Sequence, residues 1–284
     1  MKNPVARFVL GAAFAAAAFV PAAVLAAEWS DTEVLVNYGT HFREPFNPFG
    51  QKSLTKPWQN DTDVTKYYMT LQHASGYSLG RNFFFVDMLN STKNDPSGGS
   101  FGEIYSEGYT SLSLSKVTGA KLAFGPVRDL NLTAGYNFGA KSNGANPRVF
   151  LFGPTVDFNV PGFIFFNVDF LAYDDKSRFA GAASNHDTTW QITPVWLSKF
   201  SGGPMDFVFT GHVDFIGKRC PSIGSCDGRK MEILAQPEFR TDIGKFMGKK
   251  ETVYVGIKWN IWRNKFGLEG LNENNPQLQL DWKL

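Results

Sequence analysis

The chain has 284 residues, the length of one large domain or two small ones, and its 28 basic and 26 acidic residues leave a net charge of +2. So small a charge excludes a nucleic-acid binder that relies on a basic excess. Aromatic residues make up 15% of the chain, which excludes intrinsic disorder. After the N-terminus no run of about 18 apolar residues occurs, which excludes a helical membrane protein. Abundant aromatic, glycine and polar residues are typical of a β protein.

Residues 1–26 have the three parts of a secretory signal peptide. Two basic residues precede an alanine-rich apolar stretch over residues 8–20, and small residues follow it. We place the cleavage after Ala26, with Ala27 as the neighbouring option. The alternative is a transmembrane anchor, which the short apolar run and the cleavage site disfavour. The sequence therefore predicts an exported protein made of residues 27–284.

Two cysteines remain after cleavage, Cys220 and Cys226, six positions apart. Exported proteins meet oxidising conditions, so an even pair this close indicates a disulfide within a loop. Pro221 and Gly224 supply the turn between them. The alternative is a metal site, but no histidine or second cysteine pair lies beside these two residues. We expect no metal and no cofactor.

Apolar and polar residues alternate with a period of two through the rest of the chain, which predicts β-strands. In residues 277–284, for example, Leu278, Leu280 and Trp282 share one face and polar residues occupy the other. No helical period occurs after the signal peptide. Twelve alternating segments begin near these positions: Glu33, Asp63, Tyr77, Gly102, Val127, Arg148, Gly162, Asp187, Met205, Arg229, Glu251 and Gln277.

Three features favour a membrane barrel over a soluble sandwich, which also alternates. The strands are long, the apolar faces are rich in aromatic residues, and short turns such as 73–76 and 160–162 alternate with long polar loops. The long loops are 43–60, 90–100, 174–186, 218–228 and 263–275. Because an open edge leaves backbone groups unpaired in lipid, the sheet must close. We predict an all-β fold over residues 27–284: a twelve-stranded antiparallel transmembrane β-barrel in the outer membrane of a Gram-negative bacterium, with both ends periplasmic.

If the apolar faces contact lipid, the opposite faces line the lumen. The segment 81–87 has charged residues at both ends of one face, so we expect that face, with Arg81, Phe83, Phe85 and Asp87, to point inward. The other inward residues expected are Asn37, His41, Arg43, Lys66, Glu103, Glu107, Asp129, Asn131, Asp157, Asn159, Asn167, Asp169, Tyr173, Asp206, His212, Asp214, Glu232, Glu238, Arg240, Tyr254, Lys258, Asp281 and Lys283. These acids and bases either pair and fill the barrel, or they line a permeation path with a few stacking rings.

Several motifs of the first half of the chain resemble those of the nucleoside-specific outer-membrane channel family (Tsx-type). They are NYGTHFR at 37–43, NFFFVD at 82–87, EI at 103–104, LSLSK at 112–116, FGPV at 124–127, GYN at 135–137 and DFNVPG at 157–162. The resemblance implies a monomeric twelve-stranded barrel that passes nucleosides and that phages or bacterial toxins can use as a receptor. It also implies a channel-lining role for Phe83, Phe85 and Asp87. The terminal Leu284, the cysteine loop and the C-terminal third depart from the family.

The expected function is therefore passive uptake of small neutral solutes, most of all nucleosides. The expected binding residues along the channel are Arg81, Phe83, Phe85, Asp87, His41, Arg43, Glu103 and Glu107. A general diffusion porin or a structural barrel is the first alternative. A lipid-modifying enzyme is the second, but such an enzyme needs a Ser–His pair, and no recognisable constellation surrounds the four histidines. We therefore expect no enzyme and no catalytic residue.

Overall fold

The computed structural model describes residues 27–45, 58, 60–92, 95, 102–179, 182–183, 185–222 and 225–284. The proposed signal peptide, residues 1–26, lies outside the described residues, so its cleavage stays a prediction. No helix among the described residues is long and apolar enough to cross a membrane.

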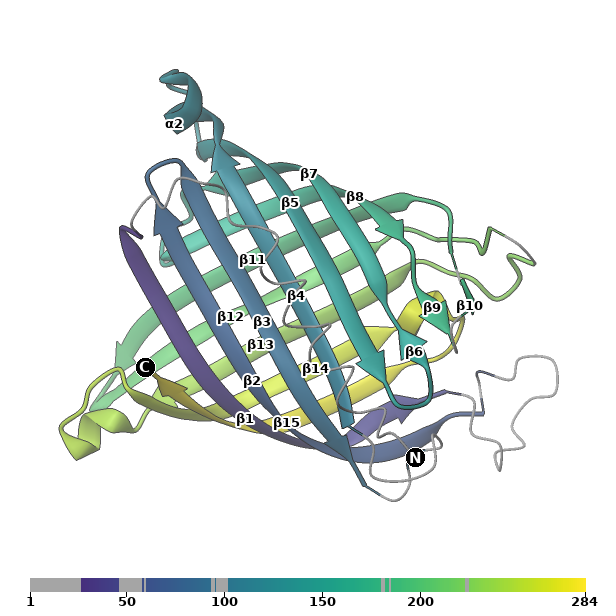
Figure 1. Cartoon of the computed structure of the whole chain (residues 1–284). Helices are drawn as coiled ribbons and strands as arrows, with labels where there is room; N and C mark the ends of the chain where they lie inside the picture. Colours follow the sequence, from purple (N-terminus) through teal and green to yellow (C-terminus); the bar gives the residue numbers. More distant parts are fainter. Residues whose placement is uncertain are drawn as a thin grey trace, which may run out of the picture.

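Twelve antiparallel strands form one closed barrel, which confirms the predicted fold class. Figure 1 shows β1 and β15 side by side where the barrel closes, and the two strands pair from Glu33↔Lys283 to Gly39↔Gln277. In chain order the barrel strands are β1 (Trp29–Glu44), β2 (Thr62–Tyr77), β3 (Gly80–Ser91), β4 (Gly102–Ser113), β5 (Val127–Lys141), β7 (Arg148–Phe158), β8 (Phe165–Asp175), β11 (Thr189–Gly202), β12 (Met205–Ile216), β13 (Glu232–Asp242), β14 (Val253–Arg263) and β15 (Glu273–Lys283).

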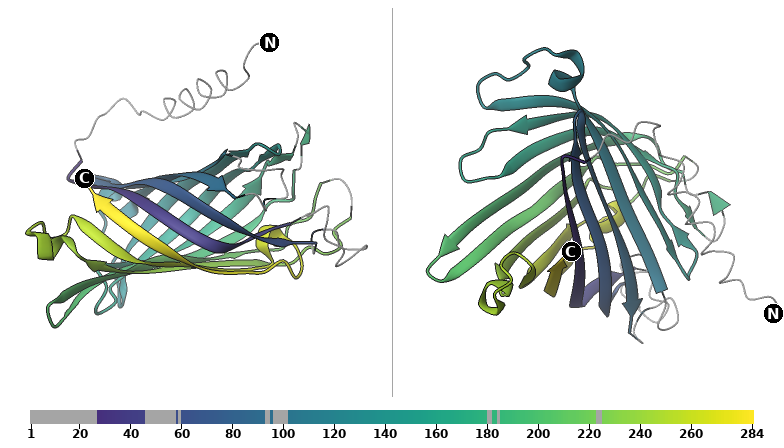
Figure 2. Two further views of the ribbon diagram at one scale, coloured as in Figure 1. Left: turned by 90° about the horizontal axis from the view of Figure 1, so that it is seen from below. Right: turned by 60° about the vertical axis from the view of Figure 1, so that its left-hand side comes forward.

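The two ends of the barrel differ. The described chain begins and ends at one end, here called the terminal end (Figure 2), which also carries the α2 helix (Leu114–Thr118) and the 3₁₀ helix η3 (Gly244–Met247). The opposite end, called the loop end, carries the small sheet of β6 (Ala145–Asn146), β9 (Arg178–Phe179) and β10 (Ala182–Ala183) and the 3₁₀ helix η4 (Lys265–Gly267). Short turns face the periplasm in outer-membrane barrels, so the prediction that both chain ends are periplasmic applies to the terminal end.

The barrel is polar inside and apolar outside. On β15 the outward Leu278 is 65% exposed, whereas the inward Gln277 is 1% exposed. The same inversion holds around the ring: exposed aromatic and aliphatic side chains alternate with buried polar ones. Apolar surface of this extent is stable only against lipid, and a closed barrel pairs every strand edge within it. The chain is an outer-membrane β-barrel.

Two sequence predictions about the connections were wrong. Residues 73–76 lie inside β2 rather than in a turn, because pairing with β1 continues to Trp29↔Gly76. His73 has a partner on this outward face, since its Nδ1 lies 2.8 Å from the Thr32 hydroxyl. The segment after β4 also contains the short helix α2, which the sequence did not predict. Ser113 begins this helix by accepting a hydrogen bond from the backbone N–H of Lys116.

Candidate channel lumen

An aromatic strip runs up the inner wall across β3 and β4. Phe83 and Phe85 lie one above the other, with ring centroids 6.2 Å apart, and Tyr105 follows at 6.1 Å from Phe85. Their register partners explain the alignment, because Phe85 pairs with Glu107 and Asp87 with Tyr105. Aromatic rings arranged in this way offer successive faces on which a planar solute can stack.

Carboxylates border the strip. Asp87 accepts a hydrogen bond from the Thr70 hydroxyl at 2.5 Å. Glu107 accepts one from Tyr105 at 2.7 Å and one from Tyr109 at 2.9 Å. A carboxylate offers about four lone-pair positions, so each group keeps capacity for further donors.

Arg81 lies at the end of the aromatic strip that is nearest the terminal end of the barrel. Its two terminal nitrogens each donate to one oxygen of Asp157, both at 2.7 Å, in a bidentate pair. Asp157 lies on β7, two strands beyond β4, because the stagger of a tilted barrel brings these residues to one height. The pair fixes Arg81 against the wall.

His41 and Arg43 do not lie on the inward face where the sequence placed them. A bulge between Gly39 and Phe42 shifts the alternation of β1, so that Phe42 faces inward opposite the fully buried Val64. Arg43 then pairs in register with Asp63 on the other face, and its Nε lies 3.2 Å from that carboxylate. His41 lies in the bulge, exposed, with Nδ1 2.8 Å from the Thr40 hydroxyl.

Near the loop end, Glu103 belongs to a network of ion pairs. Lys66 lies 2.6 Å from Glu44 and 2.8 Å from Glu103. Lys141 lies 3.0 Å from Glu44 and 3.1 Å from Asp95. The network links β1, β2, β4 and β5 through the lumen. The sequence singled out Lys66 and Glu103 but not the other three residues.

A second group of ion pairs lies toward the terminal end. Arg240 contacts both Glu33, at 3.0 Å, and Asp281. The three residues come from β13, β1 and β15, so this group joins the first and last strands of the barrel. All three side chains are buried.

One part of the inner wall is apolar. Val149, Leu151, Leu171, Tyr173 and Ile216 form a buried cluster on β7, β8 and β12. Tyr109 packs against this cluster from β4. The lumen therefore contains one apolar patch among its polar side chains. The segment 149–152 is apolar on both faces, so alternation could not indicate which side chains point inward.

The connection between β12 and β13 at the loop end contains a disulfide. Cys220 and Cys226 form a disulfide between β12 and β13, and Asp187 N–H donates to the Cys220 carbonyl at 2.8 Å. Arg219, next to the disulfide, is buried and lies 3.2 Å from Asp175 and 2.8 Å from Glu232. Burial opposes the charge of Arg219, but the neighbouring carboxylates outweigh it and hold the pKa of the guanidinium above its ordinary value. This loop is thus anchored inside the mouth of the barrel.

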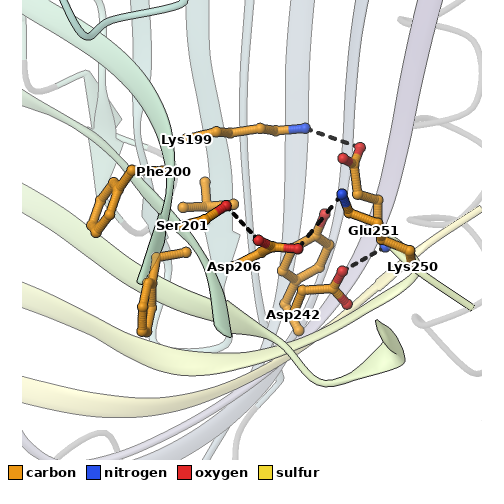
Figure 3. Close-up of a pocket in the computed structure, with 10 residues that line it drawn as sticks. Lys199, Phe200, Ser201, Asp206, Asp242, Lys250 and Glu251 are labelled. Carbon is orange, nitrogen blue, oxygen red and sulfur yellow. Dashed lines mark hydrogen bonds and ion pairs between the residues drawn. The ribbon is translucent and has the colours of Figure 1, made fainter. Parts of the chain in front are cut away.

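A small pocket lies at the terminal end (Figure 3). Its volume is about 130 Å³, below the ~300 Å³ at which ligand pockets begin. Lys199 reaches across it to Glu251 at 3.2 Å, and Asp206 lies between Ser201 and Lys250. These pairs join the β11–β12 turn to the connection between β13 and β14, so we assign the pocket no ligand.

Among the described residues no group of three or more His, Cys, Asp or Glu side chains is arranged to hold a metal ion. The four histidines have other partners. His41 and His73 contact threonine hydroxyls, and His186 and His212 lie 3.3 and 3.6 Å from Asp175 and Asp214.

No protein family model matches the chain, and no curated protein matches it in sequence. The resemblance to the nucleoside channels therefore rests on the motifs quoted above alone. Several solved structures are similar to this chain in part. An outer membrane channel from Pseudomonas putida F1 is 10% identical, with 93% of this chain and 99% of that chain covered and a TM-score of 0.48. The translocator domain of the autotransporter NalP from Neisseria meningitidis is 10% identical, with 99% and 97% covered and a TM-score of 0.45. The NanC porin is 12% identical, with 88% and 100% covered and a TM-score of 0.43.

Proposed function

We propose that the barrel is a passive channel for small solutes and that nucleosides are the class it favours. The observation that carries the proposal is solvent-accessible polar surface inside the barrel at several heights. Glu103 near the loop end keeps 25% of its side chain exposed, His212 keeps 28%, and Arg81 near the terminal end keeps 32%. A barrel packed solid by its side chains would bury His212, which lies within β12 away from both ends of the barrel.

The aromatic strip supports the choice of nucleosides. A base stacked on one ring gains about 1–3 kcal/mol, judging from single-stranded nucleic acids. Ribose hydroxyls are donors, and Asp87 and Glu107 border the strip with free acceptor positions. Each hydrogen bond to a charged group adds about 1.5–3 kcal/mol before desolvation is subtracted. Binding of this strength is weak, as a channel requires, because tight binding would slow exit.

Other functions have less support. A general porin needs no stacking strip, so an equal response to nucleosides and sugars would favour it. A lipid hydrolase needs a Ser–His pair, and the contacts of the histidines given above supply none among the described residues. The monomeric state and the receptor role for phages or toxins remain predictions from the resemblance.

The test is single-channel recording in a planar bilayer with nucleosides added to one side. We expect nucleosides to interrupt the ion current of the unmodified protein. Replacing both Phe83 and Phe85 by alanine should weaken this block about tenfold or more, the equivalent of one lost stacking contact, and leave the ion current similar or larger. Phe150 and Phe152 have the same spacing on the outward face of β7, so their double alanine variant is the matched control. Equal weakening in both variants would refute a role for the strip.

A further inference from the structure

The bases inside the lumen are outnumbered by the carboxylates around them. Lys66 forms ion pairs with both Glu44 and Glu103, and Arg240 forms ion pairs with both Glu33 and Asp281. At the loop end Arg219 pairs with both Asp175 and Glu232. Lys141 shares Glu44 and Glu103 with Lys66 and also lies near Asp95, so that network holds two bases and three carboxylates. Each of these groups is therefore negative overall even with its base charged.

Three further carboxylates have neutral partners only. Asp87 accepts from a threonine and Glu107 from two tyrosines. Asp169 accepts from Thr155 at 2.6 Å and Asn167 at 3.1 Å. None of the three takes part in an ion pair within 4.0 Å among the described residues. Hydroxyl and amide donors orient a carboxylate without cancelling its charge.

We infer that the lumen selects by charge and passes cations in preference to anions. This rests on the proposed channel function and narrows it: neutral or positively charged solutes pass more readily than anionic ones. Lys258, which lies 3.7 Å from Glu238, adds a positive charge to the lumen but does not reverse the excess of carboxylates. Rings of Asp and Glu select cations in other channels by the same electrostatics.

The test is the reversal potential of the purified protein in a planar bilayer under a potassium chloride gradient. We expect a potential of the sign set by potassium, with potassium about threefold or more as permeable as chloride. A triple variant, Asp87→Asn, Glu107→Gln and Asp169→Asn, should move the ratio toward one. These changes are nearly isosteric and keep an acceptor oxygen for each hydroxyl donor.

The matched control removes three carboxylates that lie outside the lumen: Asp63→Asn and Asp174→Asn on the outward face and Glu251→Gln in the β13–β14 connection. It changes the net charge equally and should leave the ratio unchanged. A second variant, Lys258→Gln, removes a positive charge from the lumen and should raise the ratio even if the triple variant does not fold. A conducting channel that reverses at zero or on the chloride side overturns charge selection alone. Folded, inserted protein that carries no current of ions or solutes overturns the proposed channel and this inference together.

Discussion

Arg240 shows how single residues hold the lumen together. It is buried and contacts Glu33 and Asp281, which are also buried. Removing the base from a buried ion pair leaves uncompensated charge and costs far more than the pair itself contributes. The cost falls on the strands that close the barrel, because the two acids lie on β1 and β15.

We therefore expect Arg240→Met to lower the free energy of unfolding by about 3–5 kcal/mol. Urea unfolding from lipid vesicles, followed by tryptophan fluorescence, measures it. Lys250→Met is the control, since Lys250 is an exposed base at the terminal end. A similar loss of unfolding free energy in the two variants would show that the ion pairs of Arg240 stabilise the barrel no more than an exposed ion pair does.

Gly153 tests the packing of neighbouring strands. A Cβ placed on it would lie 2.1 Å from the backbone oxygen of Phe170 on β8, a contact that no side-chain movement can relieve. We expect Gly153→Ala to destabilise the barrel by about 1–3 kcal/mol in the same unfolding measurement. Gly102→Ala should have little effect, because no atom lies within 4 Å of that position. Wild-type stability of Gly153→Ala would contradict the observed closeness of β7 and β8.

At the scale of elements, the disulfide loop depends on its neighbours as much as on its covalent bond. Ser222 N–H donates to the Asn185 carbonyl at 2.9 Å, and Lys230 N–H donates to the Gly267 carbonyl at 3.0 Å. The loop thus pairs with the segments on both sides of it at the loop end. Closing so short a loop stabilises modestly, at or below the ~2–4 kcal/mol typical of disulfides.

We expect the double variant Cys220→Ser, Cys226→Ser to fold into the same barrel but to be cut faster by protease between β12 and β13. Its channel current should rise, because the loop carries Arg219 into the mouth. Mass spectrometry of the intact, non-reduced wild-type protein supplies the control and should find no free thiol. Two free thiols there, or identical proteolysis and current in the variant, would contradict the account of this loop.

The sequence predicted more about elements than about contacts. Alternation located all twelve strands, because lipid outside and polar groups inside impose a period of two. On β3 it also indicated the orientation, since Arg81 and Asp87 mark the inward face. Alternation predicted the wrong face for His41 and Arg43, because a bulge in β1 reverses the alternation and no residue in the sequence marks the bulge.

Contacts across the lumen could not be predicted for a different reason. Arg81 meets Asp157 and Arg240 meets Glu33 only because the strands are tilted and staggered around the ring. The stagger is a property of the closed barrel and not of any strand. The tilt and stagger of the closed barrel therefore decide which base pairs with which acid.

At the scale of the whole molecule, the central claim is that the lumen conducts small solutes passively. Liposome swelling tests it most directly: vesicles containing the purified protein are diluted into iso-osmotic solutions of a nucleoside or of a sugar of similar size. The account predicts rapid swelling in the nucleoside and slower swelling in the sugar, since only the base can stack on the aromatic strip. Swelling no faster than that of protein-free vesicles, with folded protein in the membrane, would contradict it.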